Sequence, residues 1–149
     1  MYGAKSLDGG KGTAVRGNVA VDNIMGREGQ IFRTALEDKL NPEGLSTVNA
    51  KYHVAVSLTR SIIPAVVKSD GTIQRYDIRF DSAFKLFKAG AKASSFEGTL
   101  RRTGSYNVAT NANFATYEAE QDVVERVLQE MSEDYVLRIS GYLAGKYEP

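Results

Sequence analysis

The sequence contains no cysteine and no tryptophan, and its only histidine is His53. Without a thiol, these residues form no disulfide, supply no thiol nucleophile and bind no metal through sulfur. Catalysis or metal binding that needs histidine would rest on His53 alone. Neither sign of charge dominates, because 19 Lys and Arg face 18 Asp and Glu, for a formal charge of +1. A strongly basic nucleic-acid-binding protein is therefore disfavoured, and we expect no nucleic-acid partner.

Long hydrophobic runs are missing as well. No segment approaches the ~20 apolar residues of a transmembrane helix, and no basic-then-apolar stretch opens the chain as a secretory leader would. Taken alone, this pattern predicts a soluble cytoplasmic protein. A start residue that replaced a removed leader would leave the same pattern, so an exported protein is the alternative.

The overall length and composition are typical of one globular domain. The chain has 149 residues, of which 42% are hydrophobic and 25% charged, and a domain usually has roughly 100–200 residues. Residues 1–14 are rich in glycine and polar side chains and have no apolar period. We therefore predict a flexible lead-in over residues 1–14 and a single domain over residues 15–149.

Alternation of apolar and polar residues predicts four strands. The first covers residues 15–24, and the second covers 51–61 and ends before a connection that contains Pro64. The fourth covers 93–107. The third is the longest, with one apolar and one charged face, which carry Tyr76, Ile78, Phe80, Phe84 and Leu86, and Arg75, Asp77, Arg79, Asp81 and Lys85, respectively. One face of the sheet is thus expected to be core and the other to face solvent.

The last two strands are expected to form a hairpin with Gly90 at its tip. A turn centred there places Phe84 opposite Phe96 and Phe80 opposite Leu100, so that apolar side chains meet across the pair. The same register predicts that the charged face carries cross-strand ion pairs.

Helical spacing of apolar residues predicts two helices, over residues 27–41 and 116–144, with a polar loop over 108–115 before the second. The resulting order is β-α-β-β-β-α. We therefore predict an α+β fold, a two-layer sandwich in which two helices pack on one face of a four-stranded mixed or antiparallel sheet.

No catalytic set emerges from these patterns. His53 alternates out of phase with the apolar residues of its strand, so it is expected at the surface, without a nucleophile nearby. Asp77 and Asp81 lie on one strand face roughly 13 Å apart, too far for a carboxylate pair. We interpret them as partners of Arg79 and Arg101.

The aromatic residues of the predicted sheet are interpreted as core. Tyr76, Phe80, Phe84 and Phe96 share the apolar face, whereas sheets that bind RNA expose aromatics among basic residues. Charge is nevertheless uneven, because residues 68–102 hold eight basic and four acidic side chains. Either solvated faces or a surface that contacts an anion would account for this excess. From its residues alone, the chain is expected to bind rather than to catalyse.

Five short segments carry a resemblance that covers residues 15–145. GQ to LNP spans residues 29–42 in the first predicted helix, and GSYNV at 104–108 ends the fourth predicted strand. FAT at 114–116 and AEQD at 119–122 follow, and the last helix closes with LRI to YLA over 137–144. In this order and spacing the chain resembles the LptE family of lipopolysaccharide-assembly lipoproteins, whose element order is also β-α-β-β-β-α.

The resemblance implies a location. Members of the family carry a signal peptide and an acylated N-terminal cysteine, and they lie on the periplasmic side of the outer membrane. Tyr2-Gly3 resembles the Tyr-Gly that follows the acylated cysteine in related sequences. We therefore expect a protein held at the periplasmic face of the outer membrane by a lipid anchor that this chain lacks.

The resemblance also implies a partner and a ligand. The family's protein plugs the lumen of the outer-membrane β-barrel LptD and helps to place lipopolysaccharide in the outer leaflet. This role is not enzymatic and implies no cofactor and no metal. A plug needs a compact, polar exterior to sit in a polar barrel interior, and lipopolysaccharide carries phosphates that Lys and Arg can bind.

In the family, lipid contacts are ascribed to basic residues in two loops at one end of the sandwich. The loop between the second and third strands here offers Lys68, with Arg75 just beyond it. The loop before the last helix departs from the pattern, because residues 103–125 contain no Lys or Arg. Arg101 and Arg102 are taken as substitutes. The predicted lipopolysaccharide-binding residues are thus Lys68, Arg75, Arg101 and Arg102.

Two other functions are compatible with the sequence. One is a stand-alone periplasmic or cytoplasmic module that recruits a protein through an exposed strand edge. The other is a small enzyme that uses His53. A leader that ends in an acylated cysteine in the full-length gene would favour the lipoprotein over both.

Overall fold

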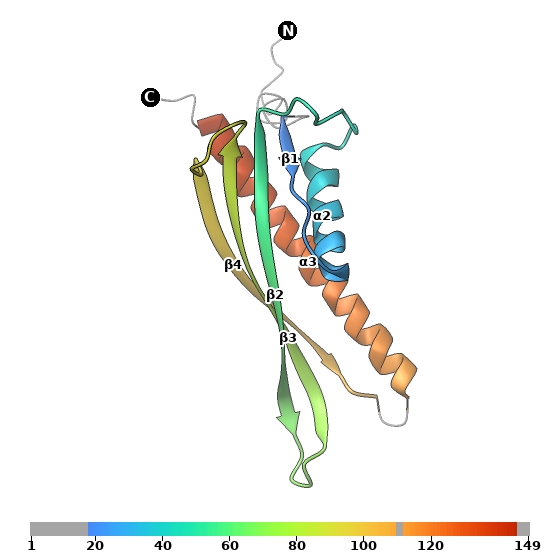
Figure 1. Cartoon of the computed structure of the whole chain (residues 1–149). Coiled ribbons are helices and arrows are strands. Elements are labelled where there is room, and N and C mark those ends of the chain that lie inside the picture. The colour runs from blue at the N-terminus through green and yellow to red at the C-terminus, as the bar shows by residue number, and fades with distance from the viewer. Residues whose placement is uncertain (1–17, 110–111, 146–149) are drawn as a thin grey trace.

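The computed structural model describes residues 18–109 and 112–145, and it has the predicted element order (Figure 1). The predicted lead-in over residues 1–14 lies outside the described residues. The elements are β1 (Val19–Val21), α2 (Arg27–Leu40), β2 (Tyr52–Val67), β3 (Ile73–Lys88), β4 (Phe96–Asn107) and α3 (Asn113–Gly145).

The sheet is mixed and has the strand order β1-β2-β3-β4. β1 runs parallel to β2, and β2, β3 and β4 form an antiparallel meander. A parallel pair needs a crossover connection, and α2 supplies it between β1 and β2. The α+β sandwich with two helices and a four-stranded mixed sheet is therefore confirmed.

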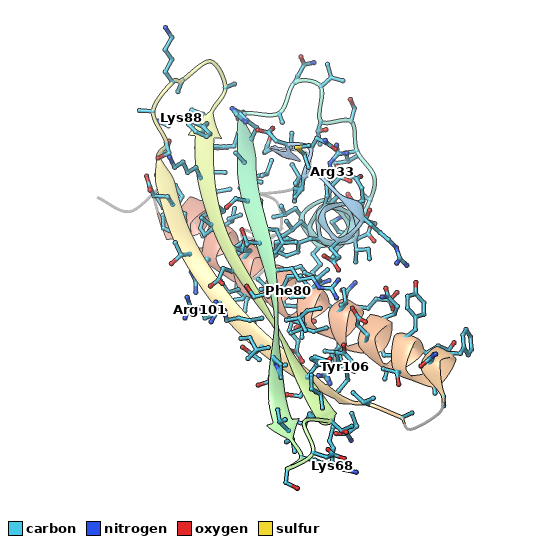
Figure 2. All side chains as sticks on the ribbon, turned by 60° about the horizontal axis from the view of Figure 1, so that its bottom comes forward. Arg33, Lys68, Phe80, Lys88, Arg101 and Tyr106 are labelled. Atoms are coloured by element: carbon cyan, nitrogen blue, oxygen red, sulfur yellow. The ribbon has the colours of Figure 1, made fainter. Side chains whose placement is uncertain are left out.

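The core lies between the sheet and the two helices. Alternate residues of β3 are buried, as the sequence predicts, and Phe80 lies in the layer between sheet and helices (Figure 2). The apolar stripe of α3 faces the same layer, and the ring of Tyr135 lies 4.7 Å from that of Phe84 and 5.8 Å from that of Phe32 on α2. α3 thus covers the apolar face of β3, and α2 packs beside α3 in the same layer.

The predicted end of the second strand at residue 61 is wrong. β2 continues through Pro64, which pairs with Tyr76, and the register shifts between Pro64 and Val66. Because β1 pairs only with Tyr52–Val54, this part of β2 lies at the edge of the sheet. The missing N–H of a proline is tolerated at an edge, where no neighbouring strand requires it.

The predicted register of the β3–β4 hairpin is wrong by two residues. Gly90 lies at the turn, with φ of 79°, but the connection continues to Ser95, whose N–H donates to the Leu86 carbonyl at 2.7 Å. Phe84 therefore pairs with Gly98 rather than with Phe96. A shift of two residues keeps every side chain on its face, so the apolar and charged faces are as predicted.

The last helix begins at Asn113, three residues before the predicted start, so the polar loop is shorter than expected. With 33 residues, α3 is about 50 Å long, close to the roughly 53 Å of the 16-residue strands β2 and β3. α2 has only 14 residues, or about 21 Å. The far half of the β2–β3 hairpin therefore extends past α2, as Figure 1 shows.

Candidate functional site

The tip of the β2–β3 hairpin forms one end of the molecule, which we call the distal end (Figure 1). The turn is closed by the Lys68 N–H, which donates to the Thr72 carbonyl at 2.8 Å. The Thr72 N–H donates to the Asp70 carboxylate at 2.9 Å, and this hydrogen bond lowers the pKa of Asp70. The tip is thus a hydrogen-bonded turn that holds Lys68 at the start of the connection.

A groove of about 590 Å³ lies at the distal end. It lies where the ends of β2 and β4 meet the starts of β3 and α3, and the Val108 N–H ties these segments by donating to the Gln74 carbonyl at 2.9 Å. Its lining residues are Val66, Lys68, Thr72, Ile73, Gln74, Arg75, Asn107, Val108, Ala109 and Asn113. The structure therefore brings two of the predicted residues, Lys68 and Arg75, to one groove.

Both basic side chains of the groove are accessible to an anion. Lys68 is exposed and forms no ion pair with the residues that the structure describes. Arg75 is half exposed, and its Nε lies 3.9 Å from Asp77 Oδ1, which also accepts a hydrogen bond from Ser105 Oγ at 2.6 Å. The long Arg75–Asp77 contact leaves most of the guanidinium donors available for a phosphate.

Exposed apolar side chains also lie on the elements that form this end of the molecule. Ile62, Ile63, Val66 and Val67, near the end of β2, are each at least two-fifths exposed. At the start of α3, Phe114 is 72% exposed and Tyr117 is about half exposed. The distal end thus combines cations with apolar surface, which is what an amphipathic anion requires.

The sequence reasoning missed the aliphatic part of this surface. Pro64 makes the residues IIPAVV at 62–67 look like part of a connection. Their signal was nevertheless present, because they form an apolar run without polar alternation in a chain that has few such runs.

The other two predicted residues do not reach the groove. Arg101 pairs with Asp81 in the β3–β4 register, six strand positions or roughly 20 Å from Arg75, and its Nε donates to Asp81 Oδ1 at 2.6 Å. Arg102 points to the opposite face of β4, where Nη1 lies 3.4 Å from Oε1 of Glu130 on α3. Figure 2 shows Lys68 and Arg101 far apart along the sheet.

The charged face of the sheet carries the ion pairs that the sequence predicts for Asp81. This carboxylate accepts from Arg101 and from Arg79 Nε, at 3.2 Å, and the hydrogen bond from Arg101 lowers the pKa of Asp81. Asp77, by contrast, contacts Ser105 and Arg75 rather than Arg79 or Arg101. This face is therefore a polar surface whose charges are largely paired.

A partly exposed cluster of ion pairs centres on Arg60 of β2. The Arg60 guanidinium on β2 donates to Glu28 at the start of α2 and to Glu120 on α3. Desolvation lowers the pKa of Arg60, but the two carboxylates outweigh it and raise this pKa above its ordinary value. Burial raises the pKa of the neighbouring Tyr106 phenol. Arg60 thus joins β2 to both helices just before the hairpin extends beyond α2.

His53 does have a partner that the sequence did not reveal. Its Nδ1 lies 3.0 Å from Oδ2 of Asp22, the residue that follows β1, and its ring stacks on Phe87 at 5.0 Å. The His53 side chain is about two-fifths exposed, so it lies at the surface, as expected. Among the described residues no cluster of three or more His, Asp and Glu side chains suits a metal ion. In the same part of the chain, no helix is long and apolar enough to cross a membrane.

Solved structures share this architecture. A candidate lipoprotein from Caulobacter crescentus is 23% identical, with a TM-score of 0.70, and the match covers 91% of this chain and 97% of that one. Rare lipoprotein B from Shewanella oneidensis is 10% identical with a TM-score of 0.63, covering 89% and 98%. A minor lipoprotein from Acinetobacter baumannii is 12% identical with a TM-score of 0.61, covering 83% and 91%. At these identities the likeness establishes the fold.

The family is established by sequence. No curated protein gives a significant match. The family model LptE, described as lipopolysaccharide-assembly, matches residues 16–139 and therefore most of the chain. This span includes every strand and α2, and all of α3 except its last turns. The chain belongs to the LptE family of lipopolysaccharide-assembly proteins.

Proposed function

We propose that this chain is the folded part of a lipoprotein that plugs the outer-membrane β-barrel LptD from the periplasmic side. In this role it helps to deliver lipopolysaccharide to the outer leaflet. The membership in the LptE family supports the proposal. The role is one of binding, without an enzymatic step, cofactor or metal. An N-terminal lipid anchor ahead of this chain would hold it at the membrane.

The open face of the sheet suits a barrel lumen. Interiors of large outer-membrane barrels are polar, so a plug must present hydrogen-bonding groups without burying unpaired charges. On this face Asp81 joins Arg79 and Arg101, and Asp77 joins Ser105. The free-energy cost of desolvation is smaller for paired charges of this kind than for isolated ones.

The distal end suits lipopolysaccharide. The single observation that carries this part of the proposal is the placement of Lys68 and Arg75 in one groove, beside the exposed aliphatic residues of 62–67. The two cations fit the phosphates of the lipid, and the apolar surface fits its acyl chains. Arg101 and Arg102 remain predictions from the resemblance, and the structure gives both of them acidic partners within the chain.

Reversing both charges of the groove tests this site. The double variant Lys68→Glu/Arg75→Glu is expected to bind purified lipopolysaccharide at least about tenfold more weakly, because each charge-assisted hydrogen bond contributes about 1.5–3 kcal/mol. Binding is measured by titrating fluorescently labelled protein with lipopolysaccharide. Lys85→Glu, an exposed reversal on β3 away from the groove, is the control and should bind like the wild type. Equal affinity of the double variant and the wild type would exclude this groove as the lipid site.

A second candidate function rests on the edge of β2. Since β1 covers only Tyr52–Val54, the remaining edge of β2 is available for an added strand from another protein. A stand-alone periplasmic module that recruits a partner through this edge would use the same feature. Coexpression with the barrel, followed by purification through a tag on this chain, separates the two functions.

A further inference from the structure

The end of the molecule opposite the distal end is also basic, and we call it the proximal end. It consists of the loop over residues 41–51 and the loop over residues 88–95, which join where the Ala89 N–H donates to the Lys51 carbonyl at 2.8 Å. These loops contain three lysines, Lys51, Lys88 and Lys92, and a single acid, Glu43. Figure 2 shows Lys88 and Lys68 at opposite ends.

All three lysines are exposed, and none forms a side-chain ion pair or hydrogen bond within residues 18–109 and 112–145. On the sheet face, by contrast, Arg79 and Arg101 are paired with Asp81. An unpaired cluster of one sign at one end of the molecule attracts an anionic surface.

Apolar side chains accompany the lysines. In the loop over 41–51, Val48 is 88% exposed and Leu45 is about half exposed. Neither contributes to the core, although burial of each would remove apolar surface from water. Cations beside protruding aliphatic groups fit the boundary between lipid headgroups and acyl chains.

The described chain also begins at the proximal end. The Tyr52 N–H donates to the Asn18 carbonyl at 2.9 Å, and Tyr52 pairs with Lys88 across the β2–β3 ladder. Residue 18 therefore lies beside Lys51 and Lys88. The groove with Lys68 lies at the other end of β2, about 50 Å away.

We propose that the proximal end rests on the anionic phospholipid headgroups of the membrane leaflet that holds the anchor. This inference rests on the proposed function, because that function supplies the anchor and the membrane. Lys51, Lys88 and Lys92 contact the phosphates, while Val48 and Leu45 enter the interface. The two basic ends then have separate ligands, with phospholipid at the proximal end and lipopolysaccharide at the distal end. The long axis of the sheet thereby points away from that leaflet.

Vesicle binding tests the proposal with the chain of residues 1–149. Its partitioning is measured by sedimentation at low ionic strength, with vesicles of phosphatidylcholine alone and of phosphatidylcholine mixed with phosphatidylglycerol. The wild type should bind the mixed vesicles only, and added salt should release it. Lys88→Glu/Lys92→Glu should lower this partitioning by about tenfold or more, because each lysine near an anionic surface adds several-fold to binding.

The matched control is Lys68→Glu/Arg75→Glu, which changes the net charge equally at the distal end. It should keep its partitioning within about twofold of the wild type, because its reversed charges lie beyond the screening length from the contacting end. An equal loss in both double variants, or no binding of the wild type to the mixed vesicles, would overturn the proposal. Lipopolysaccharide titration of the same variants separates this result from the proposed function, because Lys88→Glu/Lys92→Glu should bind that lipid normally.

Discussion

Replacement of Phe80 by alanine is expected to lower the free energy of unfolding by about 3–5 kcal/mol. Phe80 is 0% exposed and lies on the apolar face of β3, in the layer between the sheet and the helices. Without the ring, the protein loses the favourable free energy of transferring it from water to the core. The substitution also leaves a cavity that the packed neighbours fill only in part.

Urea unfolding followed by circular dichroism measures this loss. Phe114→Ala makes the same chemical change at a position that is 72% exposed, and its free energy of unfolding should stay within about 0.5 kcal/mol of the wild type. If Phe80→Ala unfolded at the same urea concentration as the wild type, the face assigned to β3 would be wrong.

Addition of one methyl group at Gly104 is the second change with a large expected effect. A Cβ there would lie 2.6 Å from Val123 Cγ1 and 2.8 Å from Val127 Cγ2, both on α3. Contacts this short force β4 and α3 apart, so Gly104→Ala is expected to destabilise the protein by about 1–3 kcal/mol. Only glycine lets the strand and the helix approach so closely.

Gly141→Ala is the matched control, because it adds the same methyl group with the opposite expected sign. A Cβ at Gly141, within α3, meets no atom within 4 Å beyond its chain neighbours and the backbone of its own helix. Alanine there should stabilise the helix by about 0.5–1 kcal/mol, because glycine costs more conformational entropy on folding. Thermal melts of the two variants compare them directly, and a Gly104→Ala variant that melted above the wild type would contradict the close packing of β4 on α3.

Hydrophobic periodicity predicted the features that depend on which face a side chain occupies. The buried positions of β3 and the stripe of α3 from Val124 to Ile139 follow directly from periods of two and of 3.6. The register of β3 with β4 did not follow, because a shift of two residues leaves the alternation unchanged. Only the length of the connection, which extends to Ser95, distinguishes the two registers.

Long-range polar contacts also could not be predicted from the sequence. The contact of Arg60 with Glu28 and Glu120 joins residues 32 and 60 positions apart, and no local pattern predicts it. Of the four predicted lipopolysaccharide-binding residues, two lie where the sequence places them, at the tip of the β2–β3 hairpin. Lys68 and Arg75 lie near each other in sequence around one turn, and a hairpin necessarily keeps them at one end. The position of Arg101 depended on the register, and the two-residue error contributed to placing it at the distal end.

The exposure of the aliphatic residues of 62–67 was also not predicted from the sequence. Proline in a strand usually marks an edge or an end, and the sequence alone favoured an end. The structure shows an edge, because β1 is too short to cover β2 and α2 is too short to reach the hairpin. Which apolar run stays exposed thus depends on the relative lengths of elements that pack only after folding.

The central claim is that this chain acts as the plug of an outer-membrane LptD barrel. The most direct measurement is coexpression of the full-length protein with the LptD-like barrel of its own genome, followed by purification in detergent through a tag on this chain. We expect the two proteins to co-elute as a stable complex. Elution of this chain alone, while the barrel folds without it, would contradict the account and favour the module that binds through the edge of β2.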